Sequence, residues 1–247
     1  MKFHAIIEAR MNSSRLPGKI LKKINNKPAI EILINRLSKT PSLDNIYIAT
    51  TINKTDDQLI KYLENKKIEY FRGSEDNVLE RVVKTAQKFK VKNIVSITGD
   101  CPLIDPNLVE QCIQVYKTHS VDIVGNALLR SFPDGMDTQI FSTKILKDSF
   151  ERSFHKKHFE HTTLYIRNNP KRYSSINIHA PYNYFWPNLG LTLDEQDDLK
   201  LIRLIYSRLV KINKNFTCLD IIEYLKKNKS LLNVNNKIKR TKVNIKF

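Results

Sequence analysis

The sequence predicts an α/β protein with a Rossmann-like, mostly parallel sheet flanked by helices. Three observations carry this prediction. Short apolar runs that suit buried strands alternate with amphipathic helical patterns through the first half of the chain. Polar residues directly follow several of these runs, and open parallel sheets bind ligands at this position. The first such connection, residues 9–21, is longer than a usual strand-to-helix loop and is cationic.

The N-terminal strand and helix illustrate the alternation. Residues 3–7 form an apolar run that predicts a buried first strand. Pro28 suits the start of a helix because it has no backbone N–H to leave unsatisfied. Ile30, Leu33 and Leu37 then repeat at the spacing of one helical face. The sequence therefore predicts a strand, a long loop and a helix in this order.

The same alternation continues to residue 124. Carboxylates at Asp56 and Asp57 favour a helix N-terminus there, and Pro106 favours another. The expected elements are a strand at 46–49, a helix from Asp56 to residue 63, a strand at 68–71, a helix at 78–89, a strand at 93–98, a helix at 106–116 and a strand at 121–124.

The second half of the chain is less regular, and we expect a single domain over residues 1–230 followed by a basic tail over 231–247. Residues 233–247 carry five Lys or Arg residues with little periodicity, which predicts a surface arm. The expected elements are a turn and strand at 132–141, helices at 143–154 and 155–167, a strand at 173–179, an aromatic loop at 183–187, a strand at 189–193, and helices at 195–209 and 217–225.

The composition bounds the function. The formal net charge is +17, but the positive residues are spread along the chain, so we interpret them as a lysine-rich background rather than a nucleic-acid-binding stripe. Their field would still attract anionic substrates such as nucleotides. Cys101, Cys112 and Cys218 lack metal-ligand spacing and suit free thiols in a reducing compartment. With no leader pattern and no long apolar run, we expect a cytoplasmic protein without membrane partners.

The loop over residues 9–21 has the chemistry of a polyphosphate site. Arg10 and Arg15 offer guanidinium forks, Lys19 offers a mobile ammonium, and Pro17-Gly18 makes a turn that frees backbone N–H groups. If the sheet is parallel, the loops after the first, third and fourth strands converge on one crevice. Arg10, Arg15 and Lys19 would then face the same ligand as Arg72, Ser74 and Asp100.

Two aspartates follow apolar runs and are candidates for Mg²⁺ binding. Asp100 lies between Gly99 and Cys101-Pro102, and Asp194 follows residues 189–193. Mg²⁺ takes one or two carboxylates together with phosphate oxygens. Both residues could instead stabilise a turn or cap the following helix.

Other candidate residues have weaker support. His155, His158 and His161 share a helical face, but no cysteine or further carboxylate cluster joins them, so a substrate contact by His161 is favoured over zinc. Tyr184 in the aromatic loop could stack on a substrate or simply pack. Cys101 has no histidine nearby in the sequence to activate it as a nucleophile.

Several motifs resemble those of the cytidylyltransferase family that activates acidic sugars, most closely its spore coat polysaccharide biosynthesis group (SpsF). Residues 9–21 resemble its nucleotide-binding loop. Further similar motifs, in the same order, are 71–79, 97–105, 133–137, Glu160-His161 and 191–194. Two positions depart from the family pattern, because Leu191 stands where the family carries Trp and Leu164 where it carries Pro.

The resemblance implies a nucleotide-diphospho-sugar transferase (glycosyltransferase-A-like) fold and, commonly, a homodimer. It implies that Mg²⁺ is held by Asp100 and Asp194, and that Arg15, Lys19 and Asp100 are catalytic. The implied nucleotide-binding residues are Ala9, Arg10, Ser14, Arg15, Lys19, Arg72, Gly73, Ser74 and Asn77. The implied substrate-binding residues are Asp137 and His161, and the aromatic loop adds Tyr184 as a further candidate.

The activity that we expect is transfer of a nucleotidyl group from CTP, or another nucleoside triphosphate, to a sugar-type acceptor for polysaccharide synthesis, with release of pyrophosphate. One alternative is a glycosyltransferase of related fold, although residues 99–101 lack the Asp-X-Asp motif common in such enzymes. The other is a basic protein that binds a polyanion while its nucleotide site stays idle.

Overall fold

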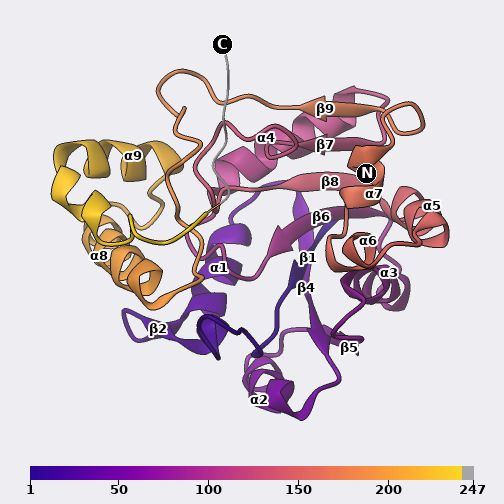
Figure 1. Ribbon diagram of the computed structural model, residues 1–247, viewed down its shortest axis with the longest axis horizontal. Coiled ribbons are helices and arrows are strands. Elements are labelled where there is room, and N and C mark those ends of the chain that lie inside the picture. The colour runs from indigo at the N-terminus through magenta and orange to yellow at the C-terminus, as the bar shows by residue number, and fades with distance from the viewer. Residues whose placement is uncertain (241–247) are drawn as a thin grey trace.

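The computed structural model describes residues 1–240 and contains a seven-stranded mixed sheet in the order β5-β4-β1-β6-β8-β7-β9 (Figure 1). The strands are β1 (Phe3–Glu8), β4 (Leu43–Thr51), β5 (Tyr70–Gly73), β6 (Asn93–Thr98), β7 (Ile123–Gly125), β8 (Gln139–Ser142) and β9 (Ser175–Asn177). Neighbours from β5 to β6 pair in parallel, β8 is antiparallel to β6 and β7, and β9 is parallel to β7. Only β8 runs against the other six strands of this sheet, so the prediction of a mostly parallel sheet is confirmed.

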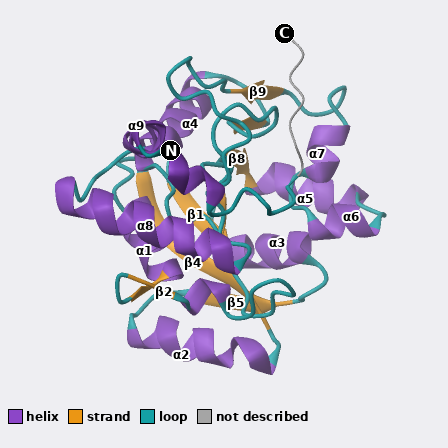
Figure 2. Cartoon of the chain, turned by 60° about the vertical axis from the view of Figure 1, so that its left-hand side comes forward, coloured by secondary structure: helices purple, strands orange, loops and turns teal. Residues whose placement is uncertain are grey.

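Helices cover both faces of this sheet (Figure 2). They are α1 (Ala29–Leu37), α2 (Asp57–Asn65), α3 (Val78–Lys88), α4 (Pro106–Thr118), α5 (Thr143–Arg152), α6 (Lys156–Glu160), α7 (Leu164–Asn168), α8 (Gln196–Ile212) and α9 (Cys218–Lys227). Side chains alternate along β1, so Ala5 and Ile7 pack with α1, α2 and α4, whereas Ile6 packs with α3, α5 and α7. The central strand is therefore buried on both faces, as a continuous apolar run predicts.

A third core cluster joins α8 and α9 to the sheet. It includes Ile24 from a small hairpin, β2 (Lys23–Ile24) and β3 (Lys27–Pro28), which lies inside the long first connection. Asn25 and Asn26 at its tip both have positive φ, as a two-residue hairpin turn with the twist of its strands requires. We did not predict this hairpin, although the Asn-Asn pair is a signal for it.

The single helix predicted over residues 155–167 is wrong, because the chain breaks between α6 and α7. The break lets Thr162, which is buried, donate its hydroxyl to Glu8 Oε1 at 2.6 Å. This hydrogen bond to the end of β1 takes the place of the backbone hydrogen bonds that a continuous helix would make here. It also places the α6 C-terminus, with Glu160 and His161, beside the carboxyl ends of β1 and β6.

The strand predicted at 189–193 is also wrong. This segment is extended but makes only one isolated bridge, between Gly190 and Asp134. The strand expected at 173–179 shortens to β9. In addition, residues 231–240 do not form a free surface arm, because Asn235 is buried and Leu231, Leu232 and Val234 pack against the α8 and α9 cluster. The remainder of the predicted tail, 241–247, lies outside the described residues.

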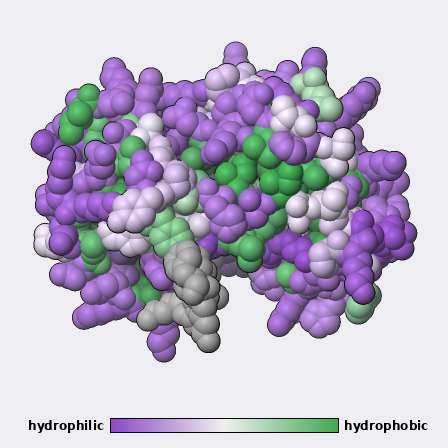
Figure 3. Space-filling view, turned by 90° about the horizontal axis from the view of Figure 1, so that it is seen from above, coloured by the Kyte–Doolittle hydropathy of each residue, from purple (hydrophilic) through white to green (hydrophobic). Residues whose placement is uncertain are grey.

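Across residues 1–240 no helix is both long and apolar enough to cross a membrane. The face seen in Figure 3 is largely hydrophilic, with hydrophobic residues gathered in patches between the hydrophilic ones.

Candidate active site

The first connection is folded tightly over the carboxyl ends of the central strands. Met11 N donates to Asp56 Oδ1 at 2.7 Å, and Gly18 N donates to Met11 O at 2.9 Å. Gly18 adopts a φ of 68°, a left-handed conformation that suits glycine. One bond therefore anchors the connection near its N-terminal end, and the other closes it into a loop.

Asp56 has a different role from the predicted one. We expected its carboxylate to favour the helix N-terminus, but the side chain is fully buried and makes no capping hydrogen bond. It accepts hydrogen bonds from Thr50 Oγ1 (2.8 Å), Thr51 Oγ1 (2.6 Å) and Met11 N (2.7 Å). It therefore clamps the end of β4 to the first connection.

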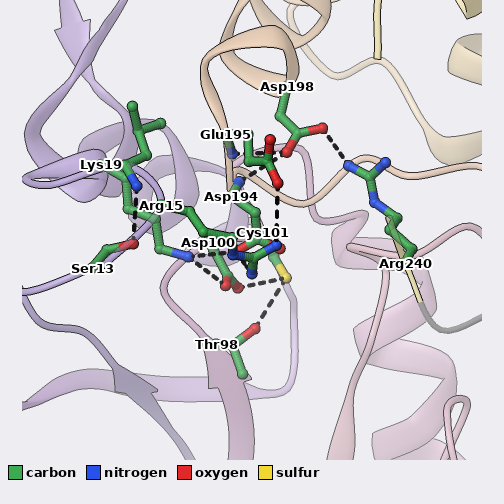
Figure 4. Close-up of polar contacts among 11 residues, drawn as sticks. Ser13, Arg15, Lys19, Thr98, Asp100, Cys101, Asp194, Glu195, Asp198 and Arg240 are labelled. Atoms are coloured by element: carbon green, nitrogen blue, oxygen red, sulfur yellow. Dashed lines mark hydrogen bonds and ion pairs between the residues drawn. The ribbon is translucent and has the colours of Figure 1, made fainter. Parts of the chain in front are cut away.

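Two aspartates from distant parts of the chain converge on one ammonium group. Lys19 Nζ lies 2.9 Å from Asp100 Oδ2 and 2.8 Å from Asp194 Oδ1 (Figure 4). Arg15 Nη2 adds a contact of 3.1 Å to Asp194 Oδ1, and its Nη1 lies 3.8 Å from Glu195 Oε1. The backbone fixes the pair as well, since Leu193 N donates to Asp100 O at 2.8 Å.

The proton on Lys19 is held firmly. Burial alone would lower the pKa of Lys19, but the charges of Asp100 and Asp194 and their hydrogen bonds outweigh it, so the pKa lies above its ordinary value. Burial likewise opposes ionisation of Asp194, yet Lys19 and Arg15 hold its pKa below the usual range. The ammonium and the Asp194 carboxylate are thus both charged at neutral pH.

Gly99 allows the close approach of β1 and β6 behind Asp100. Its N–H donates to Glu8 O at 2.9 Å, and a Cβ on Gly99 would lie 2.9 Å from that same oxygen. A side chain there would push the strand ends apart. The glycine is therefore needed where Asp100 leaves the sheet.

These residues line a cleft of about 320 Å³ at the carboxyl ends of β1 and β6. Eight of the predicted site residues line it: Ala9, Arg10, Ser14, Arg15, Lys19, Asp100, His161 and Asp194. The structure thus brings together the first connection, the β6 tip and the segment before α8.

The loop after β5 does not bring its predicted nucleotide-binding residues into this cleft. Arg72 donates from Nε to Thr51 O (2.8 Å) and pairs through Nη2 with Asp57 (2.8 Å), so it braces the loop after β4. Gly73 and Ser74 line a separate surface hollow with Arg72, and Asn77 caps α3 by accepting from Glu80 N.

Glu75 is the residue of this loop that reaches the first connection. It accepts from Arg10 Nη1 at 3.2 Å and from Asn12 Nδ2 at 2.9 Å. The predicted convergence of loops therefore holds for the first and fourth strands, and the third takes part through a carboxylate.

Glu8 and Arg81 also line the cleft and were missed by sequence reasoning. Glu8 ends an otherwise apolar strand, which is the signal that could have found it. Burial raises the pKa of Glu8, while the hydrogen bond from Thr162 and the charge of Arg81 oppose that rise. Burial lowers the pKa of Arg81.

A second chamber of about 630 Å³ adjoins the cleft and shares Arg15 and Asp194 with it. Its lining residues are Arg15, Ala127, Leu128, Leu129, Arg130, Asp134, Arg167, Asp194, Lys239 and Arg240. Of its cations, Arg130 pairs with Asp134 at 2.6 Å and Arg240 pairs with Asp198. The side chains of Arg167 and Lys239 make no hydrogen bond or ion pair within residues 1–240, although the backbone N–H of Arg167 donates to Thr163 O at 3.0 Å.

Asp137 and Tyr184 line neither the cleft nor the chamber. Asp137 is held by Arg130, with Nη2 to Oδ2 at 2.6 Å, and burial raises the pKa of Asp137 to about 6. Tyr184 packs edge-on against Phe132, with ring centroids 6.1 Å apart. Their roles as direct substrate contacts stay predictions.

Cys101 is buried beneath the site. Burial raises the pKa of its thiol well above the ordinary value, and its Sγ lies 3.2 Å from Thr98 Oγ1. This environment agrees with the expectation that Cys101 is not a nucleophile.

The donor set of Asp100 and Asp194 fits Mg²⁺. Two hard carboxylates from different loops already meet around one positive charge, and Mg²⁺ commonly takes one or two carboxylates plus phosphate oxygens. Within residues 1–240 no group of three or more His, Cys, Asp or Glu residues could hold a metal alone, including the three histidines near α6. The two carboxylates therefore suit a cation that is also bound by phosphate oxygens, and they do not suit a structural metal site in which the protein supplies every ligand.

A mixed sheet with a cationic first connection and a carboxylate pair at its carboxyl edge has its ligand-binding site where open α/β sheets usually bind ligands. The family model described as cytidylyltransferase matches residues 4–238. This chain belongs to the cytidylyltransferase family and is a nucleotidyltransferase.

Individual relatives agree with this assignment. The chain is 34% identical over 208 residues to the spore coat polysaccharide biosynthesis protein SpsF of Bacillus subtilis, covering 82% of this chain and 85% of that protein. It is 33% identical over 157 residues, 60% of each chain, to 3-deoxy-manno-octulosonate cytidylyltransferase 2 of Hydrogenovibrio crunogenus. A cytidylyltransferase structure from Leptospira borgpetersenii superposes with a TM-score of 0.89 at 27% identity, covering 97% of this chain and all of that one. The predicted sugar nucleotidyltransferase fold is confirmed.

Proposed function

We propose that the protein transfers a cytidylyl group from CTP to a sugar acid and thereby activates it for surface polysaccharide synthesis. The observation that carries the proposal is the convergence of Asp100 and Asp194 on Lys19, with Arg15 beside them. Membership of the cytidylyltransferase family supports the nucleotide. The named activities of the two curated relatives support a polysaccharide pathway and a sugar-acid acceptor.

In this proposal an acceptor hydroxyl releases its proton to solvent and its oxygen attacks the α-phosphorus of CTP. The bond between that phosphorus and the oxygen that bridges to the β-phosphate breaks, and this oxygen leaves with pyrophosphate. Lys19 and Arg15 neutralise charge that builds on the phosphate oxygens, and Arg10 and Ser14 hold the triphosphate. Such groups act chiefly by aligning the reactants and stabilising charge. Asp100 and Asp194 would hold Mg²⁺, which would neutralise negative charge during the transfer.

The adjoining chamber is the proposed acceptor site. It meets the nucleotide cleft at Arg15 and Asp194, so a molecule in it would lie next to the α-phosphate. Arg167 and Lys239 are its cations without a partner among the described residues, which suits them to an acceptor carboxylate. His161 borders the nucleotide cleft and is a further proposed substrate contact.

The remaining expectations fit this activity and are proposed with it. The protein would act in the cytoplasm, where CTP is made and its three buried cysteines remain reduced. It would work as a homodimer, with residues 1–230 and the packed segment 231–240 together forming the nucleotidyltransferase domain.

The test measures pyrophosphate release from each of the four nucleoside triphosphates with Mg²⁺ and a panel of sugar acids and phosphorylated sugars. We expect release that requires CTP, metal and acceptor and that is lost in Asp100→Asn. Arg167→Met should raise the KM for the acceptor and leave that for CTP unchanged. If CTP with Mg²⁺ neither reacts nor raises the melting temperature, the proposal fails.

A further inference from the structure

Asp198 connects the Asp194 segment to the C-terminal part of the chain. Its side chain is completely buried. One oxygen, Oδ2, accepts from the backbone N–H groups of Asp194 (3.1 Å) and Glu195 (2.9 Å). The other oxygen, Oδ1, accepts from Asn235 Nδ2 at 2.9 Å and from the Arg240 guanidinium (Figure 4).

The two oxygens of Asp198 need separate explanations. The bond from Glu195 N to Oδ2 belongs to the capping box that begins α8, and the bond from Asp194 N lies outside it. The contacts of Oδ1 come from residues 37 and 42 positions further along the chain. The capping box therefore leaves three of the four contacts of Asp198 unexplained.

The segment 234–240, which we call the C-terminal segment, is seated specifically on this carboxylate. Asn235 also donates to Gly190 O at 3.1 Å, and it is buried. Gly190 provides the space for Arg240, because a Cβ on Gly190 would overlap the guanidinium group. The contact is thus a fitted ion pair below the surface rather than a chance pairing of exposed chains.

We propose that Asp198 is a positioning residue through which the C-terminal segment sets the position of Asp194. The inference rests on the proposed function, in which Asp194 binds Mg²⁺. Asp194 has no strand to hold it, so its main chain depends on Asp198 Oδ2 and on the Leu193 bond to Asp100. The ion pair with Arg240 holds the Asp198 side chain in place. Groups that orient metal ligands from behind typically alter metal affinity by about 10–100-fold.

The experiment measures the affinity of the full chain for Mn²⁺ in the presence of CTP and without acceptor, by electron paramagnetic resonance. We compare the parent protein with Arg240→Met, Gly190→Ala and the control Lys237→Met. Arg240→Met removes the ion pair, and Gly190→Ala displaces the guanidinium while leaving both charges in the protein. Lys237→Met removes one exposed positive charge from the same segment.

We expect Arg240→Met and Gly190→Ala each to weaken Mn²⁺ binding by about tenfold and Lys237→Met to change it less than about twofold. Arg240→Lys should restore part of the affinity. Asp198→Asn should weaken binding at least as much, and combining it with Arg240→Met should add little, because both act through the same group.

Parental Mn²⁺ affinity in folded Arg240→Met and Gly190→Ala would overturn the proposal even if Asp198→Asn does not fold. Full additivity of the Asp198 and Arg240 variants would overturn it as well. A parent protein that binds no Mn²⁺ with CTP would instead overturn the proposed function, and the positioning role with it.

Discussion

Lys19 is the cation at the centre of the site, because its ammonium forms ion pairs with two carboxylates from distant loops. Arg72, from the motif at residues 71–79, is bound instead to backbone carbonyls and Asp57. The two cations make a matched pair for testing the site, since each carries one charge and only one lines the cleft.

We expect Lys19→Met to lower kcat/KM by about 10²–10³-fold, the usual effect of losing one preorganised donor to a developing charge. Arg72→Met should lower the melting temperature and reduce kcat/KM by less than about tenfold, because the lost contacts are structural. Steady-state kinetics and thermal unfolding measure both. Equal catalytic losses would mean that Arg72 also contacts the nucleotide.

Asp137 gives the protein a specific pH dependence. Burial raises the pKa of Asp137 to about 6 from an ordinary value of 3.8. Between these values the folded state holds more protons than the unfolded state, so the free energy of unfolding falls as the pH rises from about 4 to 6. Asp137→Asn should remove up to about 2 kcal/mol of this fall, measured by urea unfolding across that range.

Asp148 provides the control of opposite sign. Hydrogen bonds from Arg172 and Tyr173 hold the pKa of Asp148 well below its usual range. Its contribution to stability is therefore present above the ordinary aspartate pKa and is lost as the pH falls. Asp148→Asn should be less stable than the parent at pH 7 and should match it in strong acid. A pH profile that is unchanged in both variants would contradict these assignments.

At the scale of the elements, Asp105 caps two helices that are far apart in the sequence. Its Oδ1 accepts from Asn107 N in α4 at 2.9 Å, and its Oδ2 accepts from Cys218 N in α9 at 2.7 Å. The residue is almost completely buried. One side chain therefore fixes the beginning of α9 against the beginning of α4.

We expect Asp105→Ala to lower the free energy of unfolding by about 2–4 kcal/mol, since it removes a cap and leaves a buried N–H without a partner. Thr217→Ala removes the side-chain cap of α9 alone and should cost about 1 kcal/mol. Urea unfolding of both variants measures the difference. Equal losses of unfolding free energy in the two variants would show that the Asp105 bond between α4 and α9 adds no stability beyond that of an ordinary helix cap.

At the scale of the whole molecule, the net charge of +17 acts on the rate at which an anionic nucleotide arrives. Positive residues are dispersed over the surface, so their combined field is attractive at long range and is screened by salt. The association rate of CTP should fall by roughly tenfold between about 0.02 M and 0.3 M salt, with a smaller change in dissociation. Stopped-flow binding measures both rates.

Cytidine is the control for this prediction because it has no phosphate charge. Its association rate should be nearly independent of salt. The same salt dependence for cytidine and CTP would mean that screening acts on the protein itself rather than on the encounter.

The sequence by itself determined the order of strands and helices in the first half and the chemistry of the first connection. Apolar runs and helical periodicity are local signals, and burial on both faces makes them strong, as in β1 and β6. The family motifs added the prediction that Asp100 and Asp194 bind Mg²⁺.

Only the tertiary structure decided which polar residues meet. Asp56, Glu8 and Asp198 are single carboxylates without a distinguishing local pattern, and their partners lie far away in the sequence. Thr162 breaks a helix that periodicity predicts, because its bond to Glu8 compensates for the lost helical turn. The C-terminal segment is polar by composition, yet Asn235 and Arg240 are held by a buried charge that local sequence does not reveal. Hydrogen-bond partners of buried groups depend on three-dimensional proximity, and for this reason the site's supporting residues could not be predicted.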